Sequence, residues 1–190
     1  MHHGTFILVI GPTGSGKSTL MKHVIALYPE LVLPYSYTTR ARRADHIEND
    51  HYKFLTREEF EQKITEGAFL EWAEYGGNYY GTLKGEVEEA LAAGKTLLKE
   101  VEVQGARQIR EQLPREQLRT VFINAGSWEE LEKRVLARAH MDEAQLAERR
   151  KRYEDEVTFM PEADCVIDNT TDREAAKQAF AELIQSALQS

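Results

Sequence analysis

The sequence has a single cysteine, Cys165, in 190 residues, which excludes an intrachain disulfide and a zinc site built from cysteines. Long hydrophobic runs are also missing. The longest uninterrupted apolar run covers residues 6–10, whereas a membrane-spanning helix needs roughly 20 residues. No apolar stretch of signal-peptide length precedes this run. We therefore expect a cytoplasmic protein that is neither secreted nor inserted in a membrane.

Positively charged residues are fewer than negatively charged ones. Lys and Arg number 24 against 32 Asp and Glu, so the formal net charge is −8. This balance disfavours general nucleic-acid binding, which needs a basic face. A phosphate ligand would then require the cationic residues to be concentrated locally. The length, with 42% hydrophobic and 29% charged residues, is typical of one globular domain with a sizeable core.

The pattern of apolar residues predicts an α/β fold. Short runs rich in apolar residues predict strands at residues 6–10, 95–103, 119–124 and 165–168. Helical spacing follows the first run over residues 17–28, and the remaining strands are also separated by helical stretches. Strands that alternate with helices indicate a mainly parallel sheet with helices on both faces.

Two stretches differ from this rhythm. Residues 35–82 contain aromatic residues, arginines and glycines in short pieces, which we interpret as an inserted subdomain. Residues 139–157 are almost all charged or small, which is typical of a solvated or mobile pair of helices. Elsewhere, the Thr56 and Ser127 segments each match a capping box, in which a hydroxyl and a glutamate three residues later begin a helix.

Residues 11–18 match the phosphate-binding pattern G-x-x-x-x-G-K-[ST]. Glycines in such a loop let successive backbone N–H groups point at phosphate oxygens, and the helix that follows adds its positive end. Lys17 would reach the β- and γ-phosphates, and the Ser18 hydroxyl would ligate Mg²⁺. A chance glycine turn is the alternative, which the position between a strand and a helix disfavours. The residues predicted to bind ATP here are Gly11, Pro12, Thr13, Gly14, Ser15, Gly16, Lys17, Ser18 and Thr19. The N-K-x-D motif of GTPases is absent, since residues 169–172 lack the lysine.

Cationic residues gather in a second place. Three arginines, Arg40, Arg42 and Arg43, fall within four positions, and several tyrosines lie downstream. Guanidinium forks and phenolic hydroxyls suit a second phosphate dianion, although a solvated basic patch is the alternative. Glu71 stands among apolar and aromatic residues 69–72. A solvent-facing position is usual for such a residue, but its carboxylate can also accept both the N1–H and the 2-amino hydrogens of guanine.

The chain resembles the guanylate kinase family from about residue 6 to 183. The resemblance rests on the phosphate loop and on Ser36-Tyr37-Thr38-Thr39-Arg40, Tyr52-Lys53-Phe54, Gly67-Ala68-Phe69-Leu70-Glu71, Gly77-Asn78-Tyr79-Tyr80-Gly81-Thr82 and Val103-Gln104-Gly105-Ala106. It implies a parallel sheet of the P-loop NTPase type flanked by helices, with an inserted mixed α/β subdomain that binds a nucleoside monophosphate and a helical lid. The implied division is a core at residues 5–34, 83–138 and 158–190, a GMP-binding subdomain at 35–82 and a lid at 139–157.

The resemblance also implies roles for individual residues. The GMP phosphate would be held by Arg40, Arg43, Tyr52 and Tyr80, and guanine would be read by Ser36, Glu71 and Thr82. The catalytic cations would be Lys17, Arg40, Arg134, Arg138 and Arg149, and Asn169 would lie near the adenine of ATP. Taken singly, each of the last three arginines fits an ordinary solvent-facing position. If one helix continued from Ser127, Arg149 would return to the face of Arg134 and Arg138.

One pair of acidic residues departs from the family pattern. The family usually has Asp before Val-Gln-Gly at the position of Glu102, and the glutamate reaches one methylene further. Glu100 and Glu102 are expected to share a face at the carboxyl end of a strand, where ligands bind in parallel sheets. Glu102 would then contact GMP or hold Mg²⁺ through water, and a purely structural carboxylate is the alternative. A misplacement of about 1 Å can cost on the order of 10²-fold in rate.

The function predicted is ATP-dependent phosphorylation of GMP, and of dGMP, with Mg²⁺ as the metal. The partners would be ATP and GMP, with no nucleic acid and no membrane. Two alternatives stay open at this point. One is a kinase for another phosphorylated acceptor, such as a ribose bisphosphate. The other is a non-catalytic guanylate kinase-like binding module, which the intact phosphate loop and the three predicted lid arginines disfavour.

Overall fold

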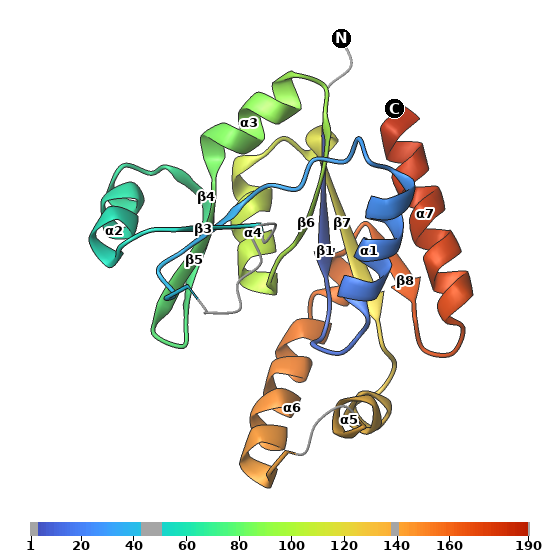
Figure 1. The fold of residues 1–190 in the computed structure, drawn as a ribbon. Helices are drawn as coiled ribbons and strands as arrows, with labels where there is room; N and C mark the ends of the chain where they lie inside the picture. Colours follow the sequence, from blue (N-terminus) through green and yellow to red (C-terminus); the bar gives the residue numbers. More distant parts are fainter. Residues whose placement is uncertain (1–3, 43–50, 138–140, 190) are drawn as a thin grey trace.

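A computed structural model describes residues 4–42, 51–137 and 141–189 (Figure 1). Its core sheet has the strand order β6-β1-β7-β8 and all neighbouring strands are parallel. The four strands are β1 (Thr5–Ile10), β6 (Thr96–Glu100), β7 (Leu118–Asn124) and β8 (Cys165–Asp168). The predicted α/β class with a parallel sheet flanked by helices is confirmed.

Strand β1 is the centre of the core because both of its faces are covered. Phe6, Leu8 and Ile10 pack in one hydrophobic cluster, and Ile7 and Val9 pack in the other. Successive strand residues point to opposite faces, so an uninterrupted apolar run is what a strand buried on both sides requires. Helices α1 (Lys17–Leu27) and α7 (Arg173–Gln189) cover one face, and α3 (Lys84–Ala92) and α4 (Val103–Gln112) cover the other (Figure 1).

Strand β6 is shorter than the sequence predicted. It ends at Glu100, and α4 begins at Val103 with Glu102 as its N-cap residue in an extended conformation. The prediction that Glu100 and Glu102 share a strand face is therefore wrong. The alternation of residues 99–103 imitates a strand, but the start of a helix on the core overrides that local pattern.

A second sheet lies beside the core, with the order β3-β2-β5-β4 and mixed strand directions. Its elements are β2 (Ser36–Thr38), β3 (Tyr52–Phe54), α2 (Arg57–Thr65), β4 (Phe69–Tyr75) and β5 (Asn78–Leu83). Gly76 and Gly77 both have positive φ in the turn between β4 and β5, as a two-residue hairpin turn that matches the strand twist demands. This mixed sheet agrees with the fold class expected, whereas the subdomain boundaries at residues 35 and 82 stay predictions.

Helix α4 fixes the edge of the second sheet to the core. The Gln108 side chain bonds both the N–H and the C=O of Trp72, each at 3.0 Å, and the Gln112 amide donates to the Leu70 carbonyl at 2.6 Å. Leu70 itself is fully buried in the core cluster beneath α3 and α4. These bonds satisfy backbone groups of an edge strand that would otherwise be open.

Two further helices lie at the end of the core sheet where the phosphate loop is found (Figure 1). Helix α5 (Trp128–Leu136) begins at the capping box of Ser127, as predicted, and α6 (Glu143–Val157) has no fully buried residue. Since α5 ends before α6 begins, the continuous helix that would return Arg149 to the face of Arg134 does not form. Arg138 lies outside the described residues, so its position on that face stays a prediction.

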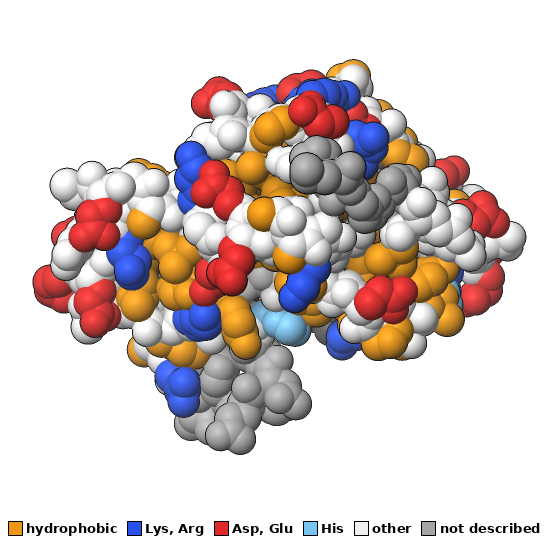
Figure 2. Space-filling view, turned by 90° about the horizontal axis from the view of Figure 1, so that it is seen from above, with side chains coloured by type: hydrophobic (Ala, Val, Ile, Leu, Met, Phe, Trp, Pro, Cys, Tyr) orange, Lys and Arg blue, Asp and Glu red, His pale blue; other side chains and the backbone are white. Residues whose placement is uncertain are grey.

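The surface mixes charges of both signs. Figure 2 shows acidic and basic side chains interspersed over one face, with apolar side chains between them. None of the helices within the described ranges combines the length and the apolar character that crossing a membrane takes.

Candidate active site

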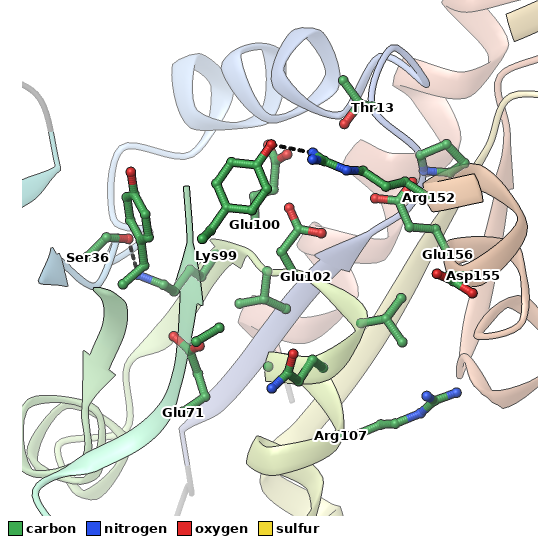
Figure 3. A pocket seen from close by; sticks show the side chains of 18 of the residues that line it. Thr13, Ser36, Glu71, Lys99, Glu100, Glu102, Arg107, Arg152, Asp155 and Glu156 are labelled. Carbon is green, nitrogen blue, oxygen red and sulfur yellow. Dashed lines mark hydrogen bonds between the residues drawn. The ribbon is translucent and has the colours of Figure 1, made fainter. Parts of the chain in front are cut away.

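A cleft of about 1570 Å³ separates the phosphate loop and α6 from the second sheet. We call it the main cleft. In Figure 3, Glu71, Lys99 and Ser36 lie on one side, Arg152, Asp155 and Glu156 on the other, and Glu100 and Glu102 between them. Parallel strands of α/β sheets commonly bind ligands at their carboxyl ends, where β1 and β6 end here. The residues of the sequence predictions that line this cleft are Pro12, Thr13, Ser36, Tyr52, Glu71, Tyr80, Glu102 and Arg149.

The phosphate loop connects β1 to α1 and holds Lys17 at its base. The Lys17 ammonium is buried and donates to the carbonyls of Gly11 at 2.6 Å and Pro12 at 3.2 Å. Its Nζ also lies 3.3 Å from a carboxylate oxygen of Glu100. The Ser18 side chain, one residue into the helix, is exposed. A buried cation at the end of a loop followed by a helix N-terminus is a favourable place for an anionic phosphate.

Asn169, which lies 154 positions after Ser15 in the sequence, is hydrogen-bonded to the phosphate loop. Its side-chain amide donates to the Ser15 carbonyl at 2.7 Å. Gly16 has φ +99°, and a Cβ placed there would come within 2.4 Å of the Asn169 amide nitrogen. A glycine is therefore required at position 16 by both the backbone conformation and the close approach. Asn169, predicted from the family to lie near adenine, is thus in contact with the phosphate loop.

A second, smaller cavity of about 600 Å³ opens on the other side of the loop. Arg134 lines it and donates to the backbone carbonyls of Asn169 at 3.0 Å and Thr170 at 2.5 Å. The predicted residues Gly14, Ser15, Gly16, Thr19 and Asn169 also border this cavity. Arg134 and Arg149 therefore line different cavities, one on each side of the phosphate loop.

Glu71 is a carboxylate buried at the second sheet. Burial raises its pKa, and a hydrogen bond from Thr82 and the charge of Lys99 act in the opposite direction. The Thr82 hydroxyl donates to Glu71 Oε1 at 2.5 Å. A Cβ at Gly105 of α4 would lie only 2.9 Å from Glu71 Oε2. The carboxylate is thus fixed by one neighbour and given room by another, with its face towards the main cleft (Figure 3).

Lys99 is a cation that the sequence did not single out. It lies in β6, is buried, and lines the main cleft. Burial lowers its pKa to about 8, although the nearby carboxylates of Glu71 and Glu86 favour the charged form. Its ammonium donates to the Ser36 hydroxyl oxygen at 2.7 Å (Figure 3).

The arginine cluster is described only in part. The Arg40 guanidinium lies 5.4 Å from the centre of the Tyr52 ring, and its Nε is buried without a hydrogen-bond partner in the described part of the chain. Tyr52 and Tyr80 line the main cleft. Arg43, the other predicted phosphate ligand, falls outside the described residues. A buried guanidinium N–H beside the cleft-lining Tyr52 is suited to an oxyanion.

Three carboxylates, from Glu100, Glu102 and Glu156, line the cleft next to the phosphate loop. Burial, followed by repulsion from Glu102, raises the pKa of Glu156 to about 7, while the Lys17 charge and a hydrogen bond from the Thr13 backbone lower it. Repulsion between carboxylates at this place would be relieved by a cation. Oxygen donors of this kind suit Mg²⁺, which usually takes only one or two carboxylates and completes its shell with phosphates and water.

Helix α6 reaches across the cleft to the second sheet. Arg152 donates to the Tyr75 hydroxyl and its guanidinium carbon lies 4.7 Å from the centre of the Tyr75 ring (Figure 3). Arg149, one turn earlier, also borders the cleft. Arg152, Tyr75, Glu156 and Lys99 were all missed by the sequence reasoning. Only Lys99 carried a signal, because a lysine within an otherwise apolar strand pattern is unusual.

The parallel core, the phosphate loop and a second sheet that faces this loop define a P-loop nucleotide-binding protein, the class that contains the nucleoside monophosphate kinases. A family model described as guanylate kinase matches residues 3–187. The guanylate kinase of Synechococcus elongatus is 43% identical over 173 residues, which are 90% of this chain and 93% of that protein. The guanylate kinase of Rubrobacter xylanophilus is 41% identical over 185 residues, covering 97% and 95%. The chain belongs to the guanylate kinase family.

A solved structure agrees with this assignment. The crystal structure of guanylate kinase from Anaplasma phagocytophilum superposes with a TM-score of 0.75 at 27% sequence identity, covering all of this chain and 89% of that one. The resemblance inferred from the sequence motifs is thereby confirmed.

Proposed function

We propose that this protein transfers the γ-phosphoryl group of ATP to GMP, giving ADP and GDP, and accepts dGMP as well. Membership of the guanylate kinase family supports an ATP-dependent nucleoside monophosphate kinase. The observation that carries the choice of guanine is the buried Glu71 carboxylate, which faces the main cleft opposite the phosphate loop. A carboxylate can accept both the N1–H and the 2-amino hydrogens of guanine, whereas it would face the N1 lone pair of adenine without a donor.

On the donor side, the phosphate loop would hold ATP. Lys17 would leave the loop carbonyls of Gly11 and Pro12 and pair with the β- and γ-phosphates. The backbone N–H groups of residues 11–18 and the start of α1 supply further positive potential. Asn169, predicted to lie near adenine, would also keep the loop in shape through its bond to Ser15. Thr19 and Arg134 border the smaller cavity on this side.

On the acceptor side, Arg40, Tyr52 and Tyr80 would bind the GMP phosphate, together with Arg43. Ser36, Glu71 and Thr82 would contact the base, and the Thr82 hydroxyl would do so chiefly by orienting Glu71. A phosphate oxygen of GMP attacks the γ-phosphorus of ATP, and the bond from this phosphorus to the β–γ bridging oxygen breaks. Since the acceptor phosphate is already anionic, no strong base is needed, and positioning and charge stabilisation supply most of the acceleration.

Mg²⁺ fits the oxygen donors beside the phosphate loop. The exposed Ser18 hydroxyl would hold it directly, and the carboxylate of Glu102 would hold it through water, with Glu100 close by. When bound, the ion neutralises charge on the β- and γ-phosphates. No cluster of three or more His, Cys, Asp or Glu side chains suited to a metal occurs within residues 4–42, 51–137 and 141–189.

Helix α6 would act as a lid. Arg134, Arg138 and Arg149 are the cations we propose for the transferred phosphoryl group, and Arg149 already lines the cleft. Because Arg134 bonds two backbone carbonyls, its part in the closed state requires a shift of that side chain. Closure would exclude water and so prevent hydrolysis of ATP. A cytoplasmic location and the absence of nucleic-acid partners stay predictions.

A coupled ADP-release assay tests the proposal across GMP, dGMP, AMP, UMP and a ribose bisphosphate. Turnover of GMP well above AMP and UMP is expected. Faster turnover of AMP than of GMP would refute the role of Glu71, and turnover of the ribose bisphosphate alone would point to the alternative kinase. Lys17→Ala serves as the inactive control and should abolish ADP release while GMP binding, measured by calorimetry, is kept.

A further inference from the structure

Lys99 joins the core sheet to the start of the second sheet. Its ammonium donates to the carbonyls of Pro34 at 3.2 Å and Tyr35 at 3.1 Å, and to the Ser36 hydroxyl oxygen at 2.7 Å. An ammonium group has three hydrogens, so this set uses all of them. The side chain is 7% exposed, and a charge buried to this extent is stable only when it is hydrogen-bonded in this way. Lys99 therefore fixes the place of Ser36 relative to β6.

The hydrogen bond from Lys99 also determines whether the Ser36 hydroxyl acts as a donor or as an acceptor towards a ligand. Its oxygen accepts from a cation, so its own hydrogen is free to point elsewhere. Within the described residues, the Ser36 hydroxyl donates no hydrogen bond. A hydroxyl that accepts from a charged donor is polarised and becomes a stronger donor itself. Ser36 and Glu71 both line the main cleft, so the cleft offers a hydroxyl donor and a carboxylate acceptor to one ligand.

We propose that Lys99 is a positioning residue for purine recognition: by donating to Ser36 Oγ, it holds the Ser36 hydroxyl as a donor towards the 6-oxo group of the acceptor purine. This inference rests on the proposed function. A 6-oxo group accepts a hydrogen bond, whereas the 6-amino group of AMP presents hydrogens that face the Ser36 hydrogen. Lys99 and Ser36 together thus favour 6-oxopurine monophosphates over 6-aminopurine monophosphates. This preference adds to the selectivity for guanine that Glu71 provides.

Charged groups reach Lys99 from two elements. Glu71 of β4 and Glu86 of α3 favour its charged form. Glu86 in turn accepts from Lys53 of β3 at 2.8 Å and from the Tyr37 hydroxyl of β2 at 2.6 Å. Glu86 is thus shared with a second cation, which leaves Glu71 as the carboxylate that Lys99 shares with the purine site. The burial of Lys99 outweighs both carboxylates, and its pKa falls to about 8.

Loss of the Lys99 proton would reverse the hydrogen bond. A neutral amine is an acceptor, so the Ser36 hydroxyl would donate to Lys99 Nζ and turn its lone pairs towards the purine. The 6-oxo group would then face another acceptor. Affinity for GMP should therefore fall as the pH rises through about 8.

The experiment compares Lys99→Met with Lys95→Met, which removes the same charge from an exposed residue before β6. Steady-state kinetics are measured with GMP, IMP, AMP and the 2-aminopurine ribonucleoside monophosphate, which has no group at C6. For Lys99→Met we expect the KM for GMP and IMP to rise about 10- to 100-fold, the range for a lost bond to a polarised donor. The kcat should stay within about threefold, and the 2-aminopurine nucleotide should be unaffected. Lys95→Met should change neither constant.

Two further measurements keep the test decisive if Lys99→Met does not fold. The wild-type KM for GMP should rise between pH 7 and 9. Titration of the purine itself affects both enzymes equally, so Ser36→Ala should remove only the part of the rise that is due to Lys99. If the double variant folds, its KM should be no higher than that of Ser36→Ala. An unchanged KM and GMP-to-AMP ratio in Lys99→Met, or a Ser36→Ala variant whose KM for GMP equals that of the wild type, would overturn the inference. A wild-type enzyme that does not phosphorylate GMP at all would instead overturn the proposed function.

Discussion

The second sheet and helix α6 border the same cleft but are held by different means. The second sheet shares the hydrophobic core through Leu70, and its edge is bonded to the side chains of Gln108 and Gln112. Helix α6 buries no residue fully. Its main attachment is Tyr153, whose ring lies 5.8 Å from that of Trp128 and whose hydroxyl donates to the Gly126 carbonyl at 2.9 Å.

The difference indicates which wall of the cleft can move at low cost. Elements with few buried apolar contacts open locally at a small fraction of the global free energy of unfolding. We therefore infer a preformed acceptor wall and a mobile wall at α6. Substitutions in the first should act on the binding of GMP, and substitutions in the second should act on turnover.

The largest effect is expected for Glu71→Gln, on the anchored wall. An amide can accept only one of the two hydrogens that guanine presents, so we expect the KM for GMP to rise about 10²-fold or more, with a smaller change in kcat. Glu88→Gln on the exposed surface of α3 is the matched control and should behave as wild type. If Glu71→Gln and Glu88→Gln had the same kcat and the same KM for GMP, Glu71 would not belong to the acceptor site.

Arg149→Ala tests the mobile wall. Removal of a cation that stabilises the transferred phosphoryl group should lower kcat about 10²-fold, while the KM for GMP and the melting temperature stay near wild type. Arg150→Ala is the control, because Arg150 pairs with Glu154 at 3.2 Å on the outer surface of α6. A rise in the GMP KM at constant kcat would mean that Arg149 belongs to substrate binding instead.

Gln112→Ala should loosen the anchored wall. The Leu70 carbonyl would lose its partner at 2.6 Å, and we expect the free energy of unfolding to fall by about 1.5 kcal/mol. Gln178→Ala on α7 removes a comparable amide that bonds Glu182 at 3.0 Å on the surface, and it should cost under about 0.5 kcal/mol. Urea unfolding of both variants makes the comparison. Equal stabilities would show that the α4 bonds do not anchor the sheet.

The smallest effect concerns Glu156 of α6, whose carboxylate accepts a hydrogen bond from the Thr13 backbone. Because burial raises the pKa of Glu156 to about 7, the native state binds its proton more tightly than the unfolded state does. The stability from this group is therefore greatest below pH 4.5 and is lost as the pH rises through about 7. Glu156→Gln should be roughly 1 kcal/mol more stable than wild type at pH 8 and equal to it near pH 4.5. Glu154→Gln, which is exposed, should show no such difference in urea unfolding at the two pH values.

The sequence predicted those parts of the molecule whose signals are local. The phosphate loop, the buried β1 run and the two capping boxes each depend on a few neighbouring residues, and all were found where expected. The end of β6 was misjudged because residues 99–103 alternate like a strand while tertiary packing starts a helix at Val103. The contacts of Lys99 with residues 34–36 could not be foreseen, since 63 positions separate it from Ser36.

For the site as well, the sequence predicted what local motifs determine and missed what the arrangement of the helices determines. Residue types and motif order led to Glu71, Tyr52 and Tyr80, which line one cleft. The separation of Arg134 from Arg149 into two cavities depends on the break between α5 and α6. A local signal for this break exists, because Asp142 and Gln145 form a capping box at the start of α6, and the sequence reasoning missed it.

The bond from Asn169 to Ser15 has a consequence for the order in which the protein is made. The phosphate loop emerges from the ribosome before the amide that holds it, which is synthesised 154 positions later. Strand β8 must also join the sheet before Asn169 can reach the loop. A nascent chain that stops before residue 169 therefore carries the complete phosphate motif without its brace. Competence to hold a triphosphate should thus appear only after the segment around residue 169 has been made and has joined the sheet.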